Sequence, residues 1–248
     1  MKPLFRWLLD TVLPPSCLAC DAPVEKEGQF CAACFKAANF VSAPMCRCCG
    51  VPLPFAAAGG NVLKCEPCTA AAPAFTQARA ALRYDETARR MILPLKYADH
   101  TEAVNGLAEL MRRPGEPLLQ AANMLVPVPL HAVRLRARRF NQAALLAIQL
   151  ARLTGRPLGL DTLIRRRETA PLEGLDLAAR RAELQGAIAI RPDADVVDKR
   201  VLLIDDVMTS GTTANECARI LLQAGARRVD VLTAARVADP RFAGLALA

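Results

Sequence analysis

The hydrophobic pattern of residues 73–248 predicts strands that alternate with helices. Short apolar runs without polar alternation are typical of strands buried on both faces, and apolar residues spaced three and four apart are typical of amphipathic helices. We predict strands at 77–84, 124–128, 201–204 and 229–233, helices at 85–95, 101–112, 141–154 and 214–224, and a loop at 114–120. This order predicts an α/β domain with a mostly parallel sheet flanked by helices.

Residues 1–72 lack this periodicity and hold nine of the ten cysteines. Eight of them form four Cys-x-x-Cys pairs, and each pair offers two thiolates to a tetrahedral Zn²⁺. We expect two closed, structural zinc sites built from neighbouring pairs, while a cross-braced grouping and iron–sulfur ligation remain alternatives. The predicted ligands are Cys17, Cys20, Cys31 and Cys34 for one site, and Cys46, Cys49, Cys65 and Cys68 for the other. So short a module should need its metal to fold.

The run VLLIDDVMTSGTT at 201–213 joins a predicted strand to a predicted helix. Its loop should lie at the carboxyl end of the strand, where open α/β sheets bind ligands. Backbone N–H groups at the start of a helix favour an anion, and Gly211 allows a tight turn. Asp205 and Asp206 suit sugar hydroxyls or a divalent cation. The run therefore predicts a site for a phosphorylated sugar.

The segment PVPLHAVRLRARRFNQ at 127–142 is rich in basic side chains and has no acid. It follows the strand MLVPV, whose prolines remove ladder hydrogen bonds and favour an edge or a strand end. A loop dense in arginine is suited to grip a pyrophosphate, because the planar guanidinium matches phosphate oxygens. The alternative is a solvated basic face or a nucleic-acid patch. Its basic residues are His131, Arg134, Arg136, Arg138 and Arg139.

The net charge of +8 lies mostly in the second domain, since residues 1–72 carry only +1. A basic balance attracts phosphate-bearing partners without choosing between small molecules and nucleic acid. No apolar run reaches the length of a membrane span. Residues 1–13 lack the features of a signal peptide and predict a short helix that packs on its own domain, with a membrane-surface contact around Trp7 as the alternative. We expect a cytoplasmic protein, with attachment to the inner face of the membrane under that alternative.

The run at 201–213 resembles the 5-phosphoribosyl-1-pyrophosphate (PRPP) motif of type I phosphoribosyltransferases. Together with the cysteine pairs, LKY at 95–97 and PVPLH…RRFNQ, it is similar to the ComF competence family over essentially the whole chain. The resemblance implies a double zinc ribbon at 1–72 and a phosphoribosyltransferase-like domain at 73–248. It implies that Asp205 and Asp206 face the ribose hydroxyls, and that Mg²⁺ accompanies PRPP. The implied ligand-binding residues are Val207, Met208, Thr209, Ser210, Gly211, Thr212, Thr213, Lys96, Pro129, Leu130, His131, Arg134 and Arg138.

This sequence departs from the family pattern at several positions. Arg139 replaces a usual glycine. In the segment that often forms a lid in phosphoribosyltransferases, Leu172, Glu183 and Ile188 replace glutamine, asparagine and phenylalanine. These departures favour ligand binding over turnover. The resemblance implies a protein of DNA uptake, and we expect it to bind a phosphoribosyl ligand and to have single-stranded DNA and uptake proteins as partners. The alternative is an active phosphoribosyltransferase that transfers the ribosyl group to a nitrogen nucleophile.

Overall fold

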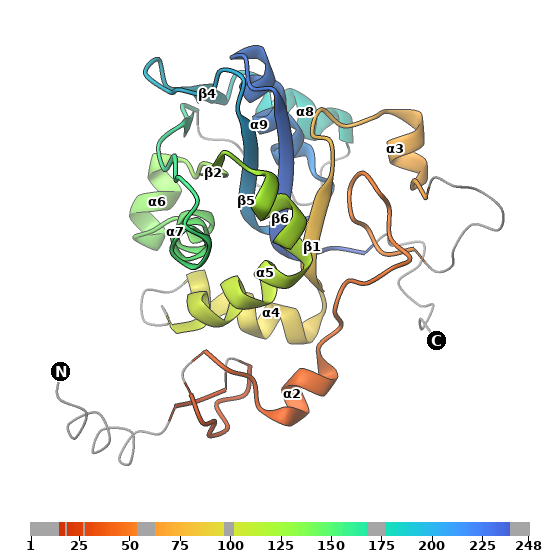
Figure 1. The fold of residues 1–248 in the computed structure, drawn as a ribbon, viewed down its shortest axis with the longest axis vertical. Coiled ribbons are helices and arrows are strands. Elements are labelled where there is room, and N and C mark those ends of the chain that lie inside the picture. The colour runs from red at the N-terminus through yellow and green to blue at the C-terminus, as the bar shows by residue number, and fades with distance from the viewer. Residues whose placement is uncertain are drawn as a thin grey trace.

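A parallel four-stranded sheet forms the centre of the larger domain (Figure 1). The computed structural model describes residues 15–17, 19–26, 28–53, 63–96, 102–167 and 177–238. The strand order is β1 (Ala78–Arg83), β6 (Arg228–Arg236), β5 (Arg200–Met208) and β2 (Met124–Pro127), and all three pairings are parallel. Strand β2 lies at the edge, as its prolines predict. The predictions for 1–13, including Trp7, and for position 172 lie outside the described residues.

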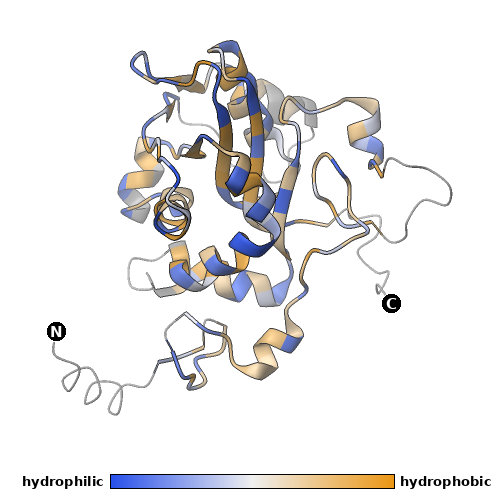
Figure 2. Ribbon diagram, in the orientation of Figure 1, coloured by the Kyte–Doolittle hydropathy of each residue, from blue (hydrophilic) through white to orange (hydrophobic). Residues whose placement is uncertain are grey.

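The two faces of the sheet are covered by different elements, because neighbouring residues of a strand point to opposite faces. Val201 and Leu203 of β5 belong to one buried cluster, which includes helix α9 (Thr212–Gln223). Leu202 and Ile204 belong to the other, with α4 (Glu86–Ile92), α5 (Glu102–Ala121) and α7 (Gln142–Thr154). Strand β5 is largely hydrophobic in Figure 2, as a strand buried on both faces should be.

Helix α5 contradicts the loop predicted at 114–120. It continues through Pro114 and Pro117, although each proline removes one helical hydrogen bond. Tertiary packing decides the outcome: Leu118 and Leu119 are buried on the sheet, and Gly115 lies so close to Leu232 that a Cβ there would be 2.5 Å from its Cδ2 atom. The burial of this turn offsets the unfavourable propensity of the prolines.

Two further boundaries differ from the prediction. Strand β5 continues to Met208, so both aspartates lie within the strand rather than after it. The predicted loop at 127–142 contains a short helix, α6 (Ala132–Arg138), whose first turn is capped by the His131 side chain. The segment compared with a lid, named the lid segment here and described at residues 163–167 and 177–190, contributes a two-stranded antiparallel sheet, β3 (Leu163–Arg165) with β4 (Ile188–Ile190), and helix α8 (Leu177–Leu184).

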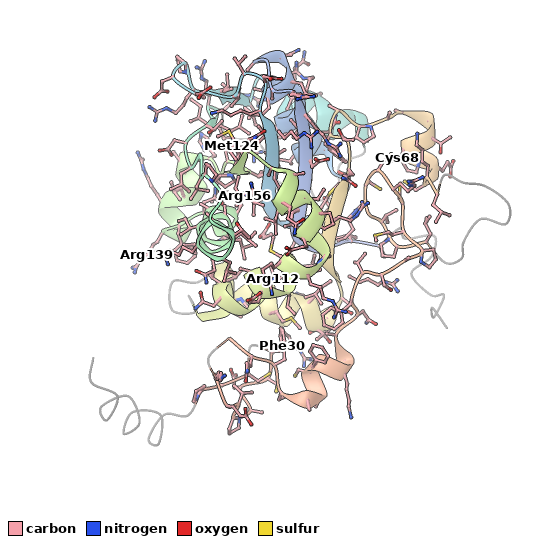
Figure 3. All side chains as sticks on the ribbon, in the orientation of Figure 1. Phe30, Cys68, Arg112, Met124, Arg139 and Arg156 are labelled. Carbon is pink, nitrogen blue, oxygen red and sulfur yellow. The ribbon has the colours of Figure 1, made fainter. Side chains whose placement is uncertain are left out.

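The cysteine-rich segment packs on both faces of the larger domain. Its short helices are α2 (Ala32–Ala37), which lies below α4 in Figure 1, and α3 (Glu66–Ala70), which lies to the right of β1. The part near α2 packs against the cluster of α4, α5 and α7, whereas the cysteines near α3 belong to the cluster of α9. Figure 3 marks these two parts by Phe30 and Cys68, which lie well apart.

Candidate functional site

The ends of β2 and β5 bring the two predicted ligand segments together. The strands are adjacent and parallel, with Pro127 opposite Ile204, and the Val128 N–H donates to the Ile204 carbonyl at 2.9 Å. The residues that follow each strand end therefore start side by side at the same edge of the sheet. Pro129 is buried there, and Leu130 and His131 are half-buried.

Asp205 and Asp206 occupy the last part of β5 and are both half-buried. The Asp206 N–H donates to Asp205 Oδ1 at 2.9 Å, and the Val207 N–H donates to Asp206 Oδ1 at 2.7 Å. Burial raises the pKa of Asp205 well above its usual value, and the charge of Asp206 raises it further. Two adjacent carboxyls of this kind are suited to a cation or to ligand hydroxyls.

The loop after β5 presents backbone N–H groups and hydroxyls at the start of α9. Gly211 is the N-cap with φ +80°, and it supplies no side chain to accept from the first-turn N–H groups. The Ser210 and Thr212 hydroxyl oxygens are 2.8 Å apart. Thr209 and Ser210 are exposed, whereas Met208 is buried. The Thr212 N–H has only a long contact of 3.4 Å to the Ser210 hydroxyl. A helix start with a left-handed glycine as its N-cap favours an anion such as phosphate.

Residues 74 and 75, which precede β1, contact this loop and the start of α9. The Ala74 N–H donates to Asn215 Oδ1 in the first turn of α9 at 2.6 Å. The buried ring of Phe75 and the methyl end of Met208 both lie against Gly211, where a Cβ would be 2.6 Å from Met208 Cε. A larger residue at position 211 would need both a strained φ and a shift of Met208.

Side-chain hydrogen bonds also attach the end of the basic segment to the edge of the sheet. Asn141 Nδ2 donates to the Val128 carbonyl at 2.9 Å, and the buried Gln142 donates to the Leu95 carbonyl at 3.2 Å. The backbone next to Lys96 therefore meets the end of β2 and the start of α7. The side chains of Lys96, Arg134 and Arg138 lie outside what the structure describes.

Arg139 ends α6 in the left-handed conformation, with φ +68° and ψ −19°. The family's usual glycine at this position has no Cβ and adopts that conformation freely. The side chain of Arg139 is exposed and lies at the outer end of α6 (Figure 3). Arginine at position 139 therefore retains the left-handed turn, but its Cβ makes that backbone conformation unfavourable.

Arg165 of β3, in the lid segment, interacts electrostatically with Asp205. The positive charge of Arg165 lowers the pKa of Asp205, although less than burial raises it. Of the three departures from the family pattern, Glu183 forms an ion pair with Arg167 at 3.4 Å, and Ile188 is buried in β4. Position 188 therefore keeps an apolar role, and position 183 has become a charged contact within the lid segment.

The eight paired cysteines gather into two groups of four. The groups are Cys17, Cys20, Cys31 and Cys34, and Cys46, Cys49, Cys65 and Cys68, with all sulfur atoms of a group within 4.8 Å of one another. Sulfurs on a tetrahedral zinc lie about 3.8 Å apart, as expected for Zn–S bonds of about 2.3 Å. The Cys20–Cys31 and Cys49–Cys65 sulfur pairs are 3.6 and 3.5 Å apart. The residues therefore fit two zinc ions, and the grouping is the sequential one.

The chemistry of the thiols also fits a metal. Burial and the neighbouring Cys49 raise the pKa of Cys68 to about 12. Four adjacent thiolates repel one another, so a divalent cation is needed to hold them all deprotonated. Backbone N–H groups already point at the sulfurs: Cys31 donates to Cys17 Sγ at 3.2 Å, and Cys65 donates to Cys46 Sγ at 3.4 Å.

Arg236, at the end of β6, is a residue that the sequence analysis missed. Its side chain is buried, and it donates to the carbonyls of Met208 and Thr209 in the loop after β5. The signal in the sequence was weak: a single basic residue ends the apolar run VLTAAR. Only the fold shows that this strand end lies beside the loop.

Comparison with known proteins agrees with these observations. Residues 8–72 match the double zinc ribbon domain family, and residues 141–243 match the phosphoribosyl transferase domain family. Competence protein F of Haemophilus influenzae is 30% identical over 232 residues, which cover 89% of this chain and 96% of that protein. DNA utilization protein YhgH of Salmonella typhi is 29% identical over 228 residues, covering 88% and 96%.

Solved structures include an allosteric regulatory enzyme of purine biosynthesis, which is 21% identical, with a TM-score of 0.37, over 57% of this chain and 30% of its own. Among the described residues, no helix combines the length and apolar character needed to span a membrane.

Proposed function

Because the chain belongs to the competence protein F family, we propose that it binds PRPP or a related phosphoribosyl ligand, together with Mg²⁺, and acts in the handling of DNA during uptake. The proposed site lies at the carboxyl ends of β5 and β2. Asp205 and Asp206 hold the ribose hydroxyls, the loop of residues 209–213 holds the 5′-phosphate, and the segment after β2 holds the pyrophosphate.

One observation carries this proposal. A pair of half-buried carboxylates is followed, after a short loop, by a helix whose N-cap is a glycine without a side chain, and the basic segment begins on the neighbouring strand. Carboxylates bind hydroxyls and Mg²⁺, whereas N–H groups bind phosphate oxygens. A ligand that binds the carboxylates through hydroxyls and the N–H groups through phosphate oxygens contains a sugar and phosphates. Bound Mg²⁺ would offset the charge of the pyrophosphate, and the chain itself would position the ligand.

The test is calorimetric titration of the zinc-loaded protein with PRPP and Mg²⁺. We expect binding by the wild type and a loss of at least about tenfold in affinity for Asp205→Asn and for Asp206→Asn, because each substitution removes a charged ligand group. Asp193→Asn is the matched control, since Asp193 forms a surface ion pair with Arg191. Absence of binding by the wild type would refute the proposal. Pyrophosphate release after ammonium is added to the same samples, as a nitrogen nucleophile that can displace pyrophosphate, tests the alternative, that the protein is an active phosphoribosyltransferase.

A second role, contact with single-stranded DNA, is favoured by an exposed pair of aromatic rings. They lie in the segment of residues 15–41 that holds the first cysteine group, named the first ribbon here. Phe35 and Phe40 are 52% and 39% exposed, and their ring centroids are 5.2 Å apart. Lys36 is exposed on the same helix. Exposed rings beside a basic side chain are typical of surfaces on which bases stack and backbone phosphates bind.

We expect Phe35→Ala to weaken binding of an oligothymidine strand by about fivefold to a hundredfold at a fixed salt concentration, as the loss of one stacked base predicts. Leu153→Ala provides the control, because Leu153 is a similarly exposed apolar side chain on α7. Equal affinities of the two variants, or equal binding of the wild type to any polyanion, would rule out stacking at this pair.

A further inference from the structure

Arg236 is a buried arginine that connects two parts of the molecule distant in sequence. Its side chain is 7% exposed. The acceptors that the structure describes for it are four backbone carbonyls and one sulfur: Cys49 O at 3.1 Å, Met208 O at 3.2 Å, Thr209 O, Val237 O at 2.7 Å and Cys49 Sγ at 3.7 Å. Its guanidinium thus lies between the second cysteine group and the loop of the proposed ligand site.

The thiolates of the second cysteine group are the negative charges nearest to Arg236 among the contacts described for it. A buried cation is costly unless it is paired. Within the described part of the chain, no carboxylate pairs with Arg236, whereas Cys49 meets it through both its carbonyl and its sulfur. A zinc ion held by four thiolates carries a net charge of −2. With zinc bound, this centre would supply a counter-charge to Arg236.

On its other side, Arg236 helps to orient the loop: the Met208 carbonyl also accepts from the Val237 N–H at 3.0 Å, whereas Arg236 is the donor described for the Thr209 carbonyl. The N–H and C=O groups of a trans peptide point in opposite directions. Because the carbonyls of Met208 and Thr209 are held toward the guanidinium, the N–H groups of Thr209 and Ser210 point away from it. These two N–H groups belong to the loop proposed to hold the 5′-phosphate.

We propose that the second metal centre positions the phosphate loop through Arg236, so that zinc at Cys46, Cys49, Cys65 and Cys68 is required for an ordered ligand site. Arg236 acts here as a positioning residue. The ligand named in this inference rests on the proposed function, but the order of the loop can be measured without any ligand.

The first metal centre provides an internal control. Its ribbon packs against the other buried cluster and contacts β1, where the Arg83 N–H donates to the Asn39 carbonyl at 2.7 Å. Among the described residues, no hydrogen bond joins this ribbon to residues 205–213. Loss of zinc from the first centre should therefore leave the loop unchanged.

The experiment compares amide hydrogen exchange at residues 208–213 in ligand-free Cys65→Ser and Cys20→Ser proteins, each expected to retain one zinc of two by elemental analysis. We expect exchange of the loop to rise at least about tenfold in Cys65→Ser, because charge-assisted hydrogen bonds are lost, and to stay as in the wild type in Cys20→Ser. Equal loop exchange in the two variants would overturn the proposal.

Arg236→Met provides a test that does not depend on the second centre surviving a cysteine change. It should keep both zinc ions, raise loop exchange about tenfold and weaken PRPP binding, while Arg236→Lys should show a smaller increase. Arg79→Met is the matched control: Arg79 donates to the Arg47 carbonyl beside the same cysteines at 3.2 Å. Wild-type loop exchange in Arg236→Met would overturn the proposal, even if PRPP does not bind.

Discussion

At the scale of single residues, Asp205 reduces the stability of the ligand-free protein. Its carboxyl is desolvated at the end of β5 and lies beside the charge of Asp206. Its pKa in the folded state is therefore higher than in the unfolded chain, where it is about 3.9. The folded state binds more protons between these two pKa values, so the free energy of unfolding falls as the pH rises through that window.

We predict that Asp205→Asn raises the Tm of the ligand-free protein at pH 7, by about 2–4 °C for each kcal/mol gained. The difference should vanish below about pH 3.9, where Asp205 is protonated in both states. Thermal unfolding between pH 3.5 and pH 8 measures it. Asp193→Asn should show the opposite sign, because Arg191 lowers the pKa of Asp193. A lower Tm for Asp205→Asn at pH 7 would contradict the argument.

Arg139 offers a second test at this scale, because its left-handed conformation costs a residue with a Cβ about 1–2 kcal/mol. Glycine removes this strain but loses about 0.5–1 kcal/mol through the greater freedom of the unfolded chain. We predict that Arg139→Gly is more stable than Arg139→Ala by about 0.5–1 kcal/mol in urea unfolding. Alanine keeps the strained Cβ and removes the charge. Equal stabilities would mean that the strain of the turn is no larger than the entropic cost of glycine.

At the scale of elements, helix α5 shows tertiary packing overriding local propensity. Pro114 and Pro117 favoured a loop, yet the helix runs on to Ala121 because its last turns bury Leu118 and Leu119. Helix α6 shows the related case of a segment interpreted as a loop from its charges. Its seven residues are followed by the left-handed C-cap Arg139, so its length depends on a turn that the sequence does not favour.

We predict that Pro117→Ala raises the Tm by several degrees, because Pro117 is exposed and alanine restores a helical N–H at a gain of up to about 3 kcal/mol. Gly115→Ala in the same helix should lower the free energy of unfolding by about 1–3 kcal/mol, since its Cβ would lie 2.5 Å from Leu232 Cδ2. Differential scanning calorimetry measures both. A stabilising Gly115→Ala would mean that helix propensity, and not close packing, controls this turn.

At the scale of the whole molecule, the two parts of the cysteine-rich segment pack against the clusters on opposite faces of the same sheet. The first ribbon also protects the edge of β1: Val41 N–H donates to the Ala81 carbonyl, and Phe40 forms an antiparallel bridge with Leu82. The second ribbon contributes the Cys48 carbonyl, which accepts from the Ala78 N–H at 2.6 Å. The ribbons thus complete the core and the sheet of the larger domain.

We therefore predict that a protein of residues 73–248 alone has a Tm roughly 10 °C or more below that of the full chain. It loses several hydrogen bonds of about 1 kcal/mol each, and each kcal/mol corresponds to about 2–4 °C. An exposed β1 edge should also promote aggregation. Thermal unfolding with light scattering tests this, with Cys20→Ser as the full-length comparison. An equal Tm would mean that the larger domain folds independently.

The strand and the helix that flank the candidate ligand loop were predictable, because they are contiguous with it in the sequence. The apolar run of β5 indicates a buried strand, and the glycine with its neighbouring hydroxyls indicates a turn into the next helix. The four cysteine pairs were predictable for a similar reason, since Cys-x-x-Cys spacing by itself sets two sulfurs on one turn. The parallel α/β class followed from the alternation of strand and helix patterns.

By itself, the sequence determined the two domains' chemistry: paired thiolates for zinc, and a carboxylate and N–H cradle next to a strand. Only the tertiary structure decided what depends on contacts between distant segments. These are the strand order, the continuation of α5 through its prolines, and the position of Arg236 between Cys49 and Thr209. The physical reason is that local patterns encode backbone propensity and solvation, whereas the partner of a buried charge is fixed only once the chain has folded.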